Sequence, residues 1–230
     1  MSVRLCVFGL LLIGLAGCEN IEGVAGNVAD QLASVGAAPD ATNEGIRTLS
    51  LLGGDVRARG PEAYCVDQGA SNARRGFAVL AGCALLSDDV ALMPSLDGLI
   101  TIQFGDEDTA SVAGNETAFA QFLETENGRA LLAGSGDLAN VAEVSTTTSE
   151  TGVLARFEDT SGPVFAGTSG PQWRGFQDIN GRLATISVLS FDRNALSRGE
   201  GERLLTVAMD ELGEVNAQVV VAEAEDEENR

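Results

Sequence analysis

The side chains that could carry out chemistry in this chain are restricted in type. There are 34 acidic residues, 14 basic residues and no histidine, and every basic residue is an arginine. Without histidine or lysine there is no Ser-His-Asp or Cys-His nucleophile, Schiff-base lysine, Walker lysine or histidine-ligated metal. Carboxylates, hydroxyls, Tyr64, arginines and four cysteines remain. Carboxylate-pair chemistry stays open, but 34 acids distinguish no pair, so we assign no catalytic residue, metal ligand or cofactor.

Cys18 has the most informative surroundings of the four cysteines. It closes an apolar run that begins at Leu5, behind Arg4, and small residues precede it. A short positive region, an apolar stretch and a small-residue cut site are the parts of a secretory signal. The 13 residues from Leu5 to Gly17 are fewer than the roughly 20 that a membrane-spanning helix needs. We therefore interpret residues 1–17 as a signal peptide.

The sequence Leu15-Ala16-Gly17-Cys18 resembles the lipobox of bacterial lipoproteins. The resemblance implies that Cys18 is acylated and becomes the first residue of the mature chain. The protein would then be anchored to a membrane with its domain facing the periplasm, at the outer membrane more than the inner. Two or more acyl chains anchor a protein stably. The alternatives are an ordinary secretory signal with a coincidental cysteine, and a buried apolar helix.

Cys65 and Cys83 are the only cysteines left once Cys6 is removed with the signal and Cys18 is acylated. Because the bacterial envelope is oxidising, we predict a structural disulfide between them. It would close a loop of 19 residues, counting both cysteines, and contribute about 3 kcal/mol. Two buried free thiols are the alternative. A catalytic role is disfavoured, since no histidine or lysine is present to lower a thiol pKa.

Charge and composition divide the chain into segments. After removal of the signal, 13 arginines face 34 acidic residues, a formal charge of −21. Such a field repels phosphate backbones, so nucleic acid is not an expected partner. Residues 18–46 are predicted to be a tether, possibly a marginal amphipathic helix, because apolar residues from Ile21 to Val35 recur at helical spacing. Residues 47–222 are predicted to be a single domain, and residues 223–230 a disordered acidic tail.

The domain is predicted to be α+β, an antiparallel sheet with two principal helices packed on it, because no regular βαβ alternation is present. Expected strands are 49–52, 55–59, 63–66, 77–86, 99–104, 141–148, 153–158, 173–179 and 182–191. Asn180-Gly181 between the last two is the strongest hairpin signal. One helix is expected over 116–133, capped by Asn115 and broken at Asn127-Gly128. Another is expected to follow the capping box Ser197-Arg198-Gly199-Glu200.

Two short patterns imitate ligand motifs. Gly134 to Ala139 matches the dinucleotide pattern G-x-G-x-x-A, but it follows a helix and precedes a strand, so we interpret it as a helix end and turn. Gly105 to Thr109 contains three adjacent acids, but it lacks the alternating ligands and distal glutamate of a calcium loop. We interpret that segment as a solvated turn.

Residues 55–215 resemble a family of uncharacterised lipoproteins from marine alphaproteobacteria. The similar segments are Gly60 to Asp67, Ala81 to Cys83, Gly128 to Leu132, Trp173 to Phe176 and Asn180 to Leu183. The order of the predicted elements is also similar to PsbP-like envelope domains. Neither resemblance implies a reaction or supplies a catalytic residue.

Two classes of function follow. The favoured one is a lipid-anchored envelope protein without catalytic activity that binds a protein partner or helps assembly. The other is a small-ligand-binding protein or carboxylate-based enzyme with a site near Trp173. There Trp173, Arg174 and Phe176 follow a Gly/Pro-rich loop and could present a stacking surface with a charged group. Core packing plus a surface ion pair is the simpler interpretation of these three residues.

Overall fold

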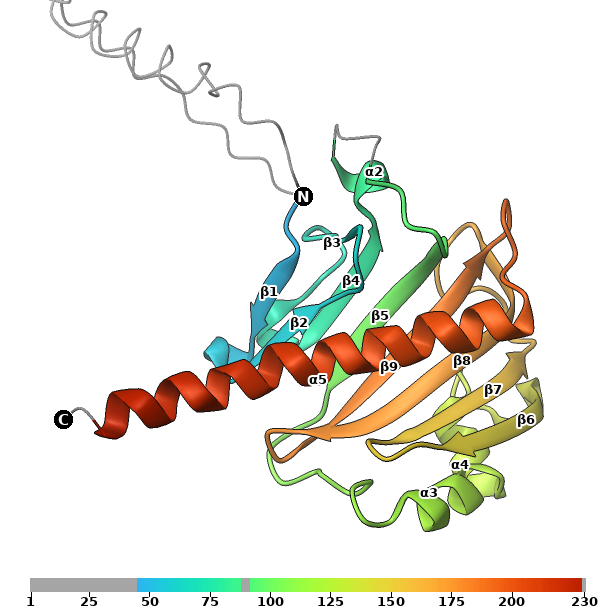
Figure 1. The fold of residues 1–230 in the computed structure, drawn as a ribbon. Coiled ribbons are helices and arrows are strands. Elements are labelled where there is room, and N and C mark those ends of the chain that lie inside the picture. Colours follow the sequence, from blue (N-terminus) through green and yellow to red (C-terminus); the bar gives the residue numbers. More distant parts are fainter. Residues whose placement is uncertain (1–44, 88–91, 229–230) are drawn as a thin grey trace, which may run out of the picture. The chain divides into compact units, whose positions relative to one another are not determined.

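The computed structural model describes residues 45–87 and 92–228, with side chains up to residue 217. Its centre is an antiparallel sheet of seven strands in the order β3-β4-β5-β9-β8-β7-β6 (Figure 1). These strands are β3 (Tyr64–Val66), β4 (Phe77–Gly82), β5 (Gly98–Phe104), β6 (Val141–Thr148), β7 (Val153–Asp159), β8 (Thr168–Ile179) and β9 (Arg182–Phe191). β1 (Thr48–Leu51) and β2 (Val56–Arg59) form a separate two-stranded hairpin.

The helices cover both faces of the sheet. The long helix α5 (Arg198–Glu228) crosses one face, whereas α3 (Glu116–Leu123) and α4 (Glu126–Leu132) lie against the other face at β6 and β7 (Figure 1). A short helix, α2 (Cys83–Leu86), follows β4, and single 3-10 turns lie at Leu52–Gly54, Ala73–Arg75 and Leu138–Asn140. The predicted α+β class, an antiparallel sheet with helices packed on it, is confirmed.

The alternation of side chains along β9 explains why two cores form. Ala184, Ile186 and Val188 are fully buried against Leu205, Ala208 and other apolar residues of α5. Leu189 points to the other face and packs with residues of β4 and β5. Because successive residues of a strand point to opposite faces, a strand with apolar residues on both faces requires cover on both sides. Each fully buried aliphatic side chain contributes about 1.5–3 kcal/mol.

Two hairpins of the structure turn at residues with positive φ, and the one predicted at Asn180-Gly181 is among them. Asn180 and Gly181 both have positive φ, 49° and 76°, the conformation that a tight turn of this kind requires. Gly53 and Gly54, with φ of 80° and 114°, connect β1 to β2. The β1–β2 hairpin packs against α5, where the buried Asn216 accepts a hydrogen bond from Arg57 N at 2.9 Å and donates one to Arg57 O at 2.9 Å.

The structure corrects several expected boundaries. β4 ends at Gly82 and α2 begins at Cys83, so the apolar run 77–86 is not one strand. The break between α3 and α4 lies at residues 124–125, where Thr125 caps α4 by accepting a hydrogen bond from Gly128 N. Asn115 makes no side-chain capping bond. The backbone of α5 continues to Glu228, through most of the expected tail.

Two residues of the α3–α4 region are more exposed than expected. In the helix expected over 116–133, Phe122 and Leu131 would face inward together with Leu123 and Leu132, but they are 37% and 53% exposed. For Leu131 the changed break point is the reason, because restarting the helix at Glu126 rotates the residues that follow it. Phe122 lies before the break, on the exposed side of α3.

The predicted signal peptide, Cys18 and most of the predicted tether fall within residues 1–44, outside the described residues. The described elements belong to one compact unit. No helix within the described ranges is long and apolar enough to cross a membrane.

Candidate functional site

The segment around Trp173 does not form the stacking surface expected as one alternative. Trp173 points toward α5, is 2% exposed and lies in the core between sheet and helix. Phe176 is 3% exposed and lies in the other core, with its ring centroid 5.2 Å from that of Phe119. The two aromatic rings are on opposite faces of β8, since their positions are three apart and side chains alternate between the two faces of a strand. The hypothesis of a stacking surface is therefore wrong.

Arg174, in β8, forms hydrogen bonds to α4 and to β9. Its Nη1 donates hydrogen bonds to Leu131 O at 2.9 Å and Leu132 O at 3.2 Å, at the C-terminal end of α4, and its Nε donates to Ser187 Oγ at 3.1 Å. The guanidinium also lies 5.2 Å from the centroid of the Phe157 ring. Burial lowers the pKa of Arg174 to about 10, so the guanidinium stays charged at neutral pH. Its positive charge is attracted to the partial negative charge at the C-terminal end of α4.

A small cavity lies beside this segment, under the Gly/Pro-rich loop. Its volume is about 160 Å³, and it is lined by Asp159, Thr160, Gly162, Pro163, Val164, Thr168, Ser169, Gly170, Gln172 and Leu189. Asp159 holds the loop by accepting hydrogen bonds from Ser161 Oγ at 2.6 Å and Gly134 N at 2.7 Å. Burial raises the pKa of Asp159, but these bonds and the charge of Arg174 outweigh it, so the net pKa is lowered.

Cys65 and Cys83 form the predicted disulfide, with an S–S distance of 1.99 Å. Cys65 lies in β3, and Cys83 is the first residue of α2. Both cysteines are fully buried. The bond joins a strand to the helix that follows β4, whereas two neighbouring strands were expected.

Tyr64, another residue that the composition left open for chemistry, is part of the core. It is 1% exposed, and its hydroxyl donates to Leu96 O at 2.6 Å and accepts from Gly98 N at 3.1 Å. Burial raises the pKa of Tyr64 well above its ordinary value, and the nearby carboxylate of Asp97 raises it further. The phenol therefore stays protonated, and its hydrogen bonds to Leu96 and Gly98 hold the start of β5 in position.

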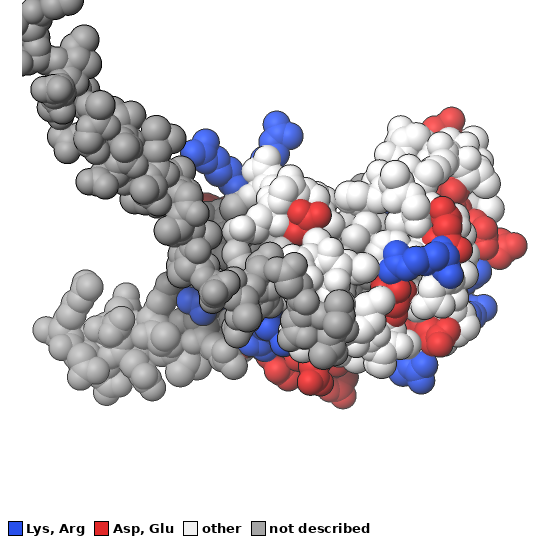
Figure 2. Space-filling model, turned by 90° about the horizontal axis from the view of Figure 1, so that it is seen from above, with Lys and Arg blue, Asp and Glu red and all other residues white. Residues whose placement is uncertain are grey.

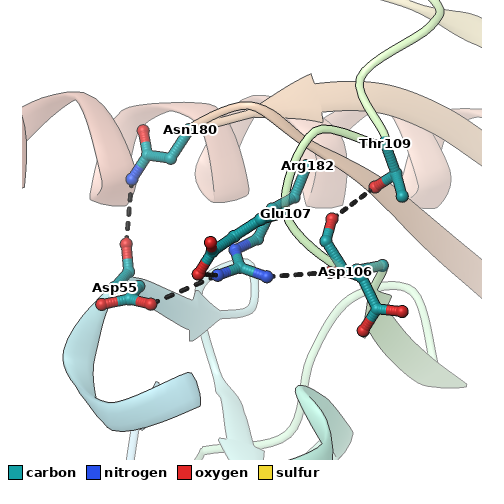
Figure 3. A network of polar contacts seen from close by, with 7 residues as sticks. Asp55, Asp106, Glu107, Thr109, Asn180 and Arg182 are labelled. Carbon is teal, nitrogen blue, oxygen red and sulfur yellow. Dashed lines mark hydrogen bonds and ion pairs between the residues drawn. The ribbon is translucent and has the colours of Figure 1, made fainter.

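Arg182 is the centre of a polar network that joins three loops (Figure 3). Its side chain is 8% exposed, and its Nη2 lies 2.8 Å from Glu107 Oε1 and 3.3 Å from Asp55 Oδ2. Its Nη1 donates to Gly105 O at 3.2 Å, while Asn180 Nδ2 donates to Asp55 O at 3.0 Å. The network connects the β1–β2 turn, the loop after β5 and the β8–β9 hairpin.

The acidic turn 105–109 therefore has a structural role that its sequence did not reveal. Glu107 pairs with Arg182, and Thr109 Oγ1 donates to Asp106 O at 2.7 Å and accepts from Leu183 N at 3.0 Å. Next to it, the Asp178 carboxylate accepts three backbone hydrogen bonds, from Ser111, Val112 and Ala113. Among the residues that the structure describes, no three His, Cys, Asp or Glu side chains are grouped to hold a metal ion.

The larger hollows lie along α5. One, of about 500 Å³, is lined by Thr151, Gln177, Asp178, Ile179, Met209, Asp210, Gly213, Glu214 and Ala217; we call it the α5 groove. A second, of about 440 Å³, is lined by Arg47, Thr48, Arg59, Gly60, Glu62 and Glu211. In the second, Arg59 Nη2 lies 2.9 Å from Glu211 Oε2, so its central charges are already paired.

Charged side chains are dispersed over the surface that Figure 2 presents. Acidic and basic residues form small separate groups there, among uncharged residues. This dispersion agrees with the pairing seen in the contacts, in which Arg59, Arg156, Arg182 and Arg193 each contact a carboxylate. Acidic residues outnumber arginines in the sequence.

Known proteins supply little to compare with this chain. No protein-family model and no curated protein matches it. Similar solved structures include a mutant of the protein Mog1 and the Ran-binding protein Mog1p of Saccharomyces cerevisiae. Each is 11% identical, and each match covers 74% of this chain and 92% of that chain with a TM-score of 0.39. We draw no functional conclusion from a likeness at this level.

Proposed function

We propose that this protein is a lipid-anchored envelope protein that binds a protein partner or helps assembly without catalysing a reaction. The observation that carries the proposal is Leu15-Ala16-Gly17-Cys18 at the end of a short apolar run. In this proposal Cys18 is acylated, and the domain faces the periplasm, at the outer membrane more than the inner. The resemblance to alphaproteobacterial envelope lipoproteins belongs to the same proposal.

The disulfide supports the export part of the proposal. Disulfides form and persist in oxidising compartments such as the bacterial periplasm and are rare in the cytosol. The Cys65–Cys83 bond is buried and joins two elements of the domain. A protein exported to the periplasm would form this bond after translocation.

The contacts of the polar residues support a role without catalysis. Arg174, Arg182, Asp159 and Asp178 are among the charged groups that the composition leaves for chemistry, and each of them binds backbone groups of another element. Tyr64 is bonded in the same way. These side chains position loops and the end of α4, which is a structural role.

Crosslinking in intact cells, followed by purification from membranes, tests the partner-binding part. A protein that is recovered at constant ratio after stringent washing, and lost when crosslinker is omitted or when Cys18 is replaced by alanine, supports the proposal. Recovery of a small molecule bound to the uncrosslinked protein, with no protein partner, would instead favour the ligand-binding alternative. The cavity beside Gln172 is then the place to search for it.

A further inference from the structure

A small cavity lies between the sheet and the start of α5. Its volume is about 20 Å³, and its lining includes Ser145, Leu154, Arg156, Trp173, Arg198 and Glu202; we call it the α5 N-terminal pocket. Arg156 pairs with Trp173 on β8 and with Ser145 on β6, so these three residues share one face of the sheet. Trp173 packs against Gly201 of α5, and this contact places the start of the helix over β7 and β8 (Figure 1).

Two buried N–H groups in the lining residues have no acceptor within the described part of the chain. Trp173 is 2% exposed, and its indole Nε1 makes no hydrogen bond. Arg156 Nε is buried and without a hydrogen bond as well. Both nitrogens can only donate, and buried polar atoms in native proteins are almost always hydrogen-bonded. We therefore expect the α5 N-terminal pocket to take a hydrogen-bond acceptor.

The ion pairs of Arg156 leave its inner nitrogen free. Glu143 Oε2 lies 3.6 Å from Nη1, and Glu158 Oε1 lies 3.3 Å from Nη2. The two glutamate side chains are 70% and 38% exposed, so solvent screens much of their charge. The Nε on the buried side of the guanidinium thus keeps its need for an acceptor.

The surroundings of the pocket favour an acceptor with negative charge. Arg198 Nη2 donates to the uncharged Ser145 Oγ at 3.1 Å, and Arg198 makes no ion pair with a described residue. Arg198 is also the first residue of α5, so the partial positive charge of the helix N-terminus lies at the same place. Glu202 is the acidic residue of the lining, and its carboxylate opposes an anion there.

The size of the pocket selects a single atom. A cavity needs roughly 10–15 Å³ to hold one water molecule, and this one offers about 20 Å³. A halide ion fits such a space, whereas a sulfate or phosphate group needs room for its additional oxygens. Water fits by size as well, but it brings no charge to compensate the arginines.

We propose that the α5 N-terminal pocket binds a monatomic anion such as chloride, which accepts hydrogen bonds from Trp173 Nε1 and Arg156 Nε and compensates the charge of Arg198. The bound ion connects β7 and β8 to the first turn of α5. This inference goes beyond the proposed function, since it involves neither the lipid anchor nor a protein partner.

Titration of the full mature chain, purified from membranes in detergent, with sodium bromide tests the proposal. Bromide quenches indole fluorescence by its heavy atom, and Trp173 is the only tryptophan in the chain. Sodium gluconate, whose anion is too large for the pocket, keeps the ionic strength constant. We expect quenching that saturates, because the ion occupies one site beside the indole, and chloride should reverse it by competition. Collisional quenching would not saturate.

Two substitutions at the mouth of the pocket should shift the bromide Kd in opposite directions. Arg198→Gln removes a positive charge and should raise the Kd at least about fivefold, whereas Glu202→Gln removes the opposing carboxylate and should lower it at least about twofold. Both residues are exposed, so neither substitution disturbs the core. Arg74→Gln is the matched control, since it removes the same charge from an exposed turn before β4 and should change the Kd less than about twofold.

Urea denaturation followed by circular dichroism measures the contribution of the indole N–H. Chloride at constant ionic strength should raise the midpoint of the wild type in a saturable way, because a ligand that binds only the folded state stabilises it. Trp173→Phe, which lacks the N–H, should lose this shift; should that variant fail to fold, a reduced shift in Arg198→Gln carries the same test.

Three results would overturn the inference. They are quenching without saturation, equal effects of Arg198→Gln and Arg74→Gln, and a higher Kd for Glu202→Gln. A wild type whose stability does not respond to chloride would mean that the two donors bind water, and it would refute the anion site equally.

Discussion

The contact between Trp173 and Gly201 shows how a single residue fixes the position of α5. A Cβ at position 201 would overlap three carbons of the indole ring, so only glycine allows the first turn of the helix to lie this close to β8. Trp173 is the only tryptophan in the chain and one of its largest fully buried side chains. Trp173, a candidate for ligand stacking in the sequence, instead packs against Gly201 and sets the position of α5 on the sheet.

Replacing Gly201 by alanine should therefore destabilise the domain, although alanine is the better helix former. We expect a loss of about 1–3 kcal/mol from overpacking against Trp173, measured by urea denaturation with tryptophan fluorescence. Gly213→Ala is the matched control, since nothing lies within 4 Å of a Cβ there, and it should stabilise the domain by about 0.5–1 kcal/mol. Stabilisation by both substitutions would contradict the proposed packing.

Asp159 should make a measurable part of the stability depend on pH. Its pKa is lower in the folded protein than its ordinary value of 3.8, so the unfolded chain binds more protons in acid. Its contribution is therefore present above pH about 4 and is lost as the pH falls through the folded pKa. Asp159→Asn should cost about 0.5–1 kcal/mol at pH 7, because the group is partly exposed, and less as the pH falls through the folded pKa.

The measurement for Asp159 is urea denaturation of wild type and variant at several pH values between 2 and 7. Asp192→Asn serves as the control, because Asp192 makes no side-chain hydrogen bond or ion pair within the described residues, and its effect should stay small at every pH. A difference between wild type and Asp159→Asn that is the same at all pH values would refute the charge-dependent role.

At the level of secondary-structure elements, the disulfide joins β3 to α2 at one edge of the sheet. β3 has only three residues and pairs with β4 alone, so it has few hydrogen bonds of its own. The covalent bond compensates for this by limiting the unfolded chain.

Replacing both Cys65 and Cys83 by serine should lower the free energy of unfolding by about 2–4 kcal/mol, measured by urea denaturation. Reduction of the wild-type protein should produce a loss of similar size, which controls for the effect of the serine side chains. Non-reducing peptide mapping identifies the bond directly, and labelling of both cysteines as free thiols in protein taken from the periplasm would exclude it.

Local signals made the larger part of this architecture predictable. The Asn180-Gly181 turn and the capping box at Ser197 act over a few residues, and each forms as expected: Ser197 N, for example, donates to Glu200 Oε2 at 2.9 Å. The end of β4 was missed because a continuous apolar run does not show where a strand gives way to a buried helix.

The polar contacts were not predictable, because they join residues far apart in sequence. Arg182 and Asp55 are 127 positions apart, and Arg174 reaches α4 across more than 40 positions. No local pattern indicates such pairs. The same limit applies to the α5 groove, which is lined by residues of β8, of the turn between β6 and β7 and of α5.

For the molecule as a whole, the proposed lipid anchor at Cys18 would attach an acidic domain to a membrane. Membrane attachment should depend on Cys18 and not on Cys6, although both cysteines lie in or beside the apolar run. We expect Cys18→Ala to stop lipidation and processing and to move the protein out of the detergent phase on partitioning. Cys6→Ala, which alters a residue that would be removed with the signal, should leave attachment unchanged.

Mass spectrometry of the intact protein purified from membranes tests the proposed lipid anchor. We expect a mature chain that begins at Cys18, with a mass higher than that of its amino acids by the mass of the acyl groups. A mature chain that starts at another residue, or one with Cys18 at its start and no acyl group, would contradict it.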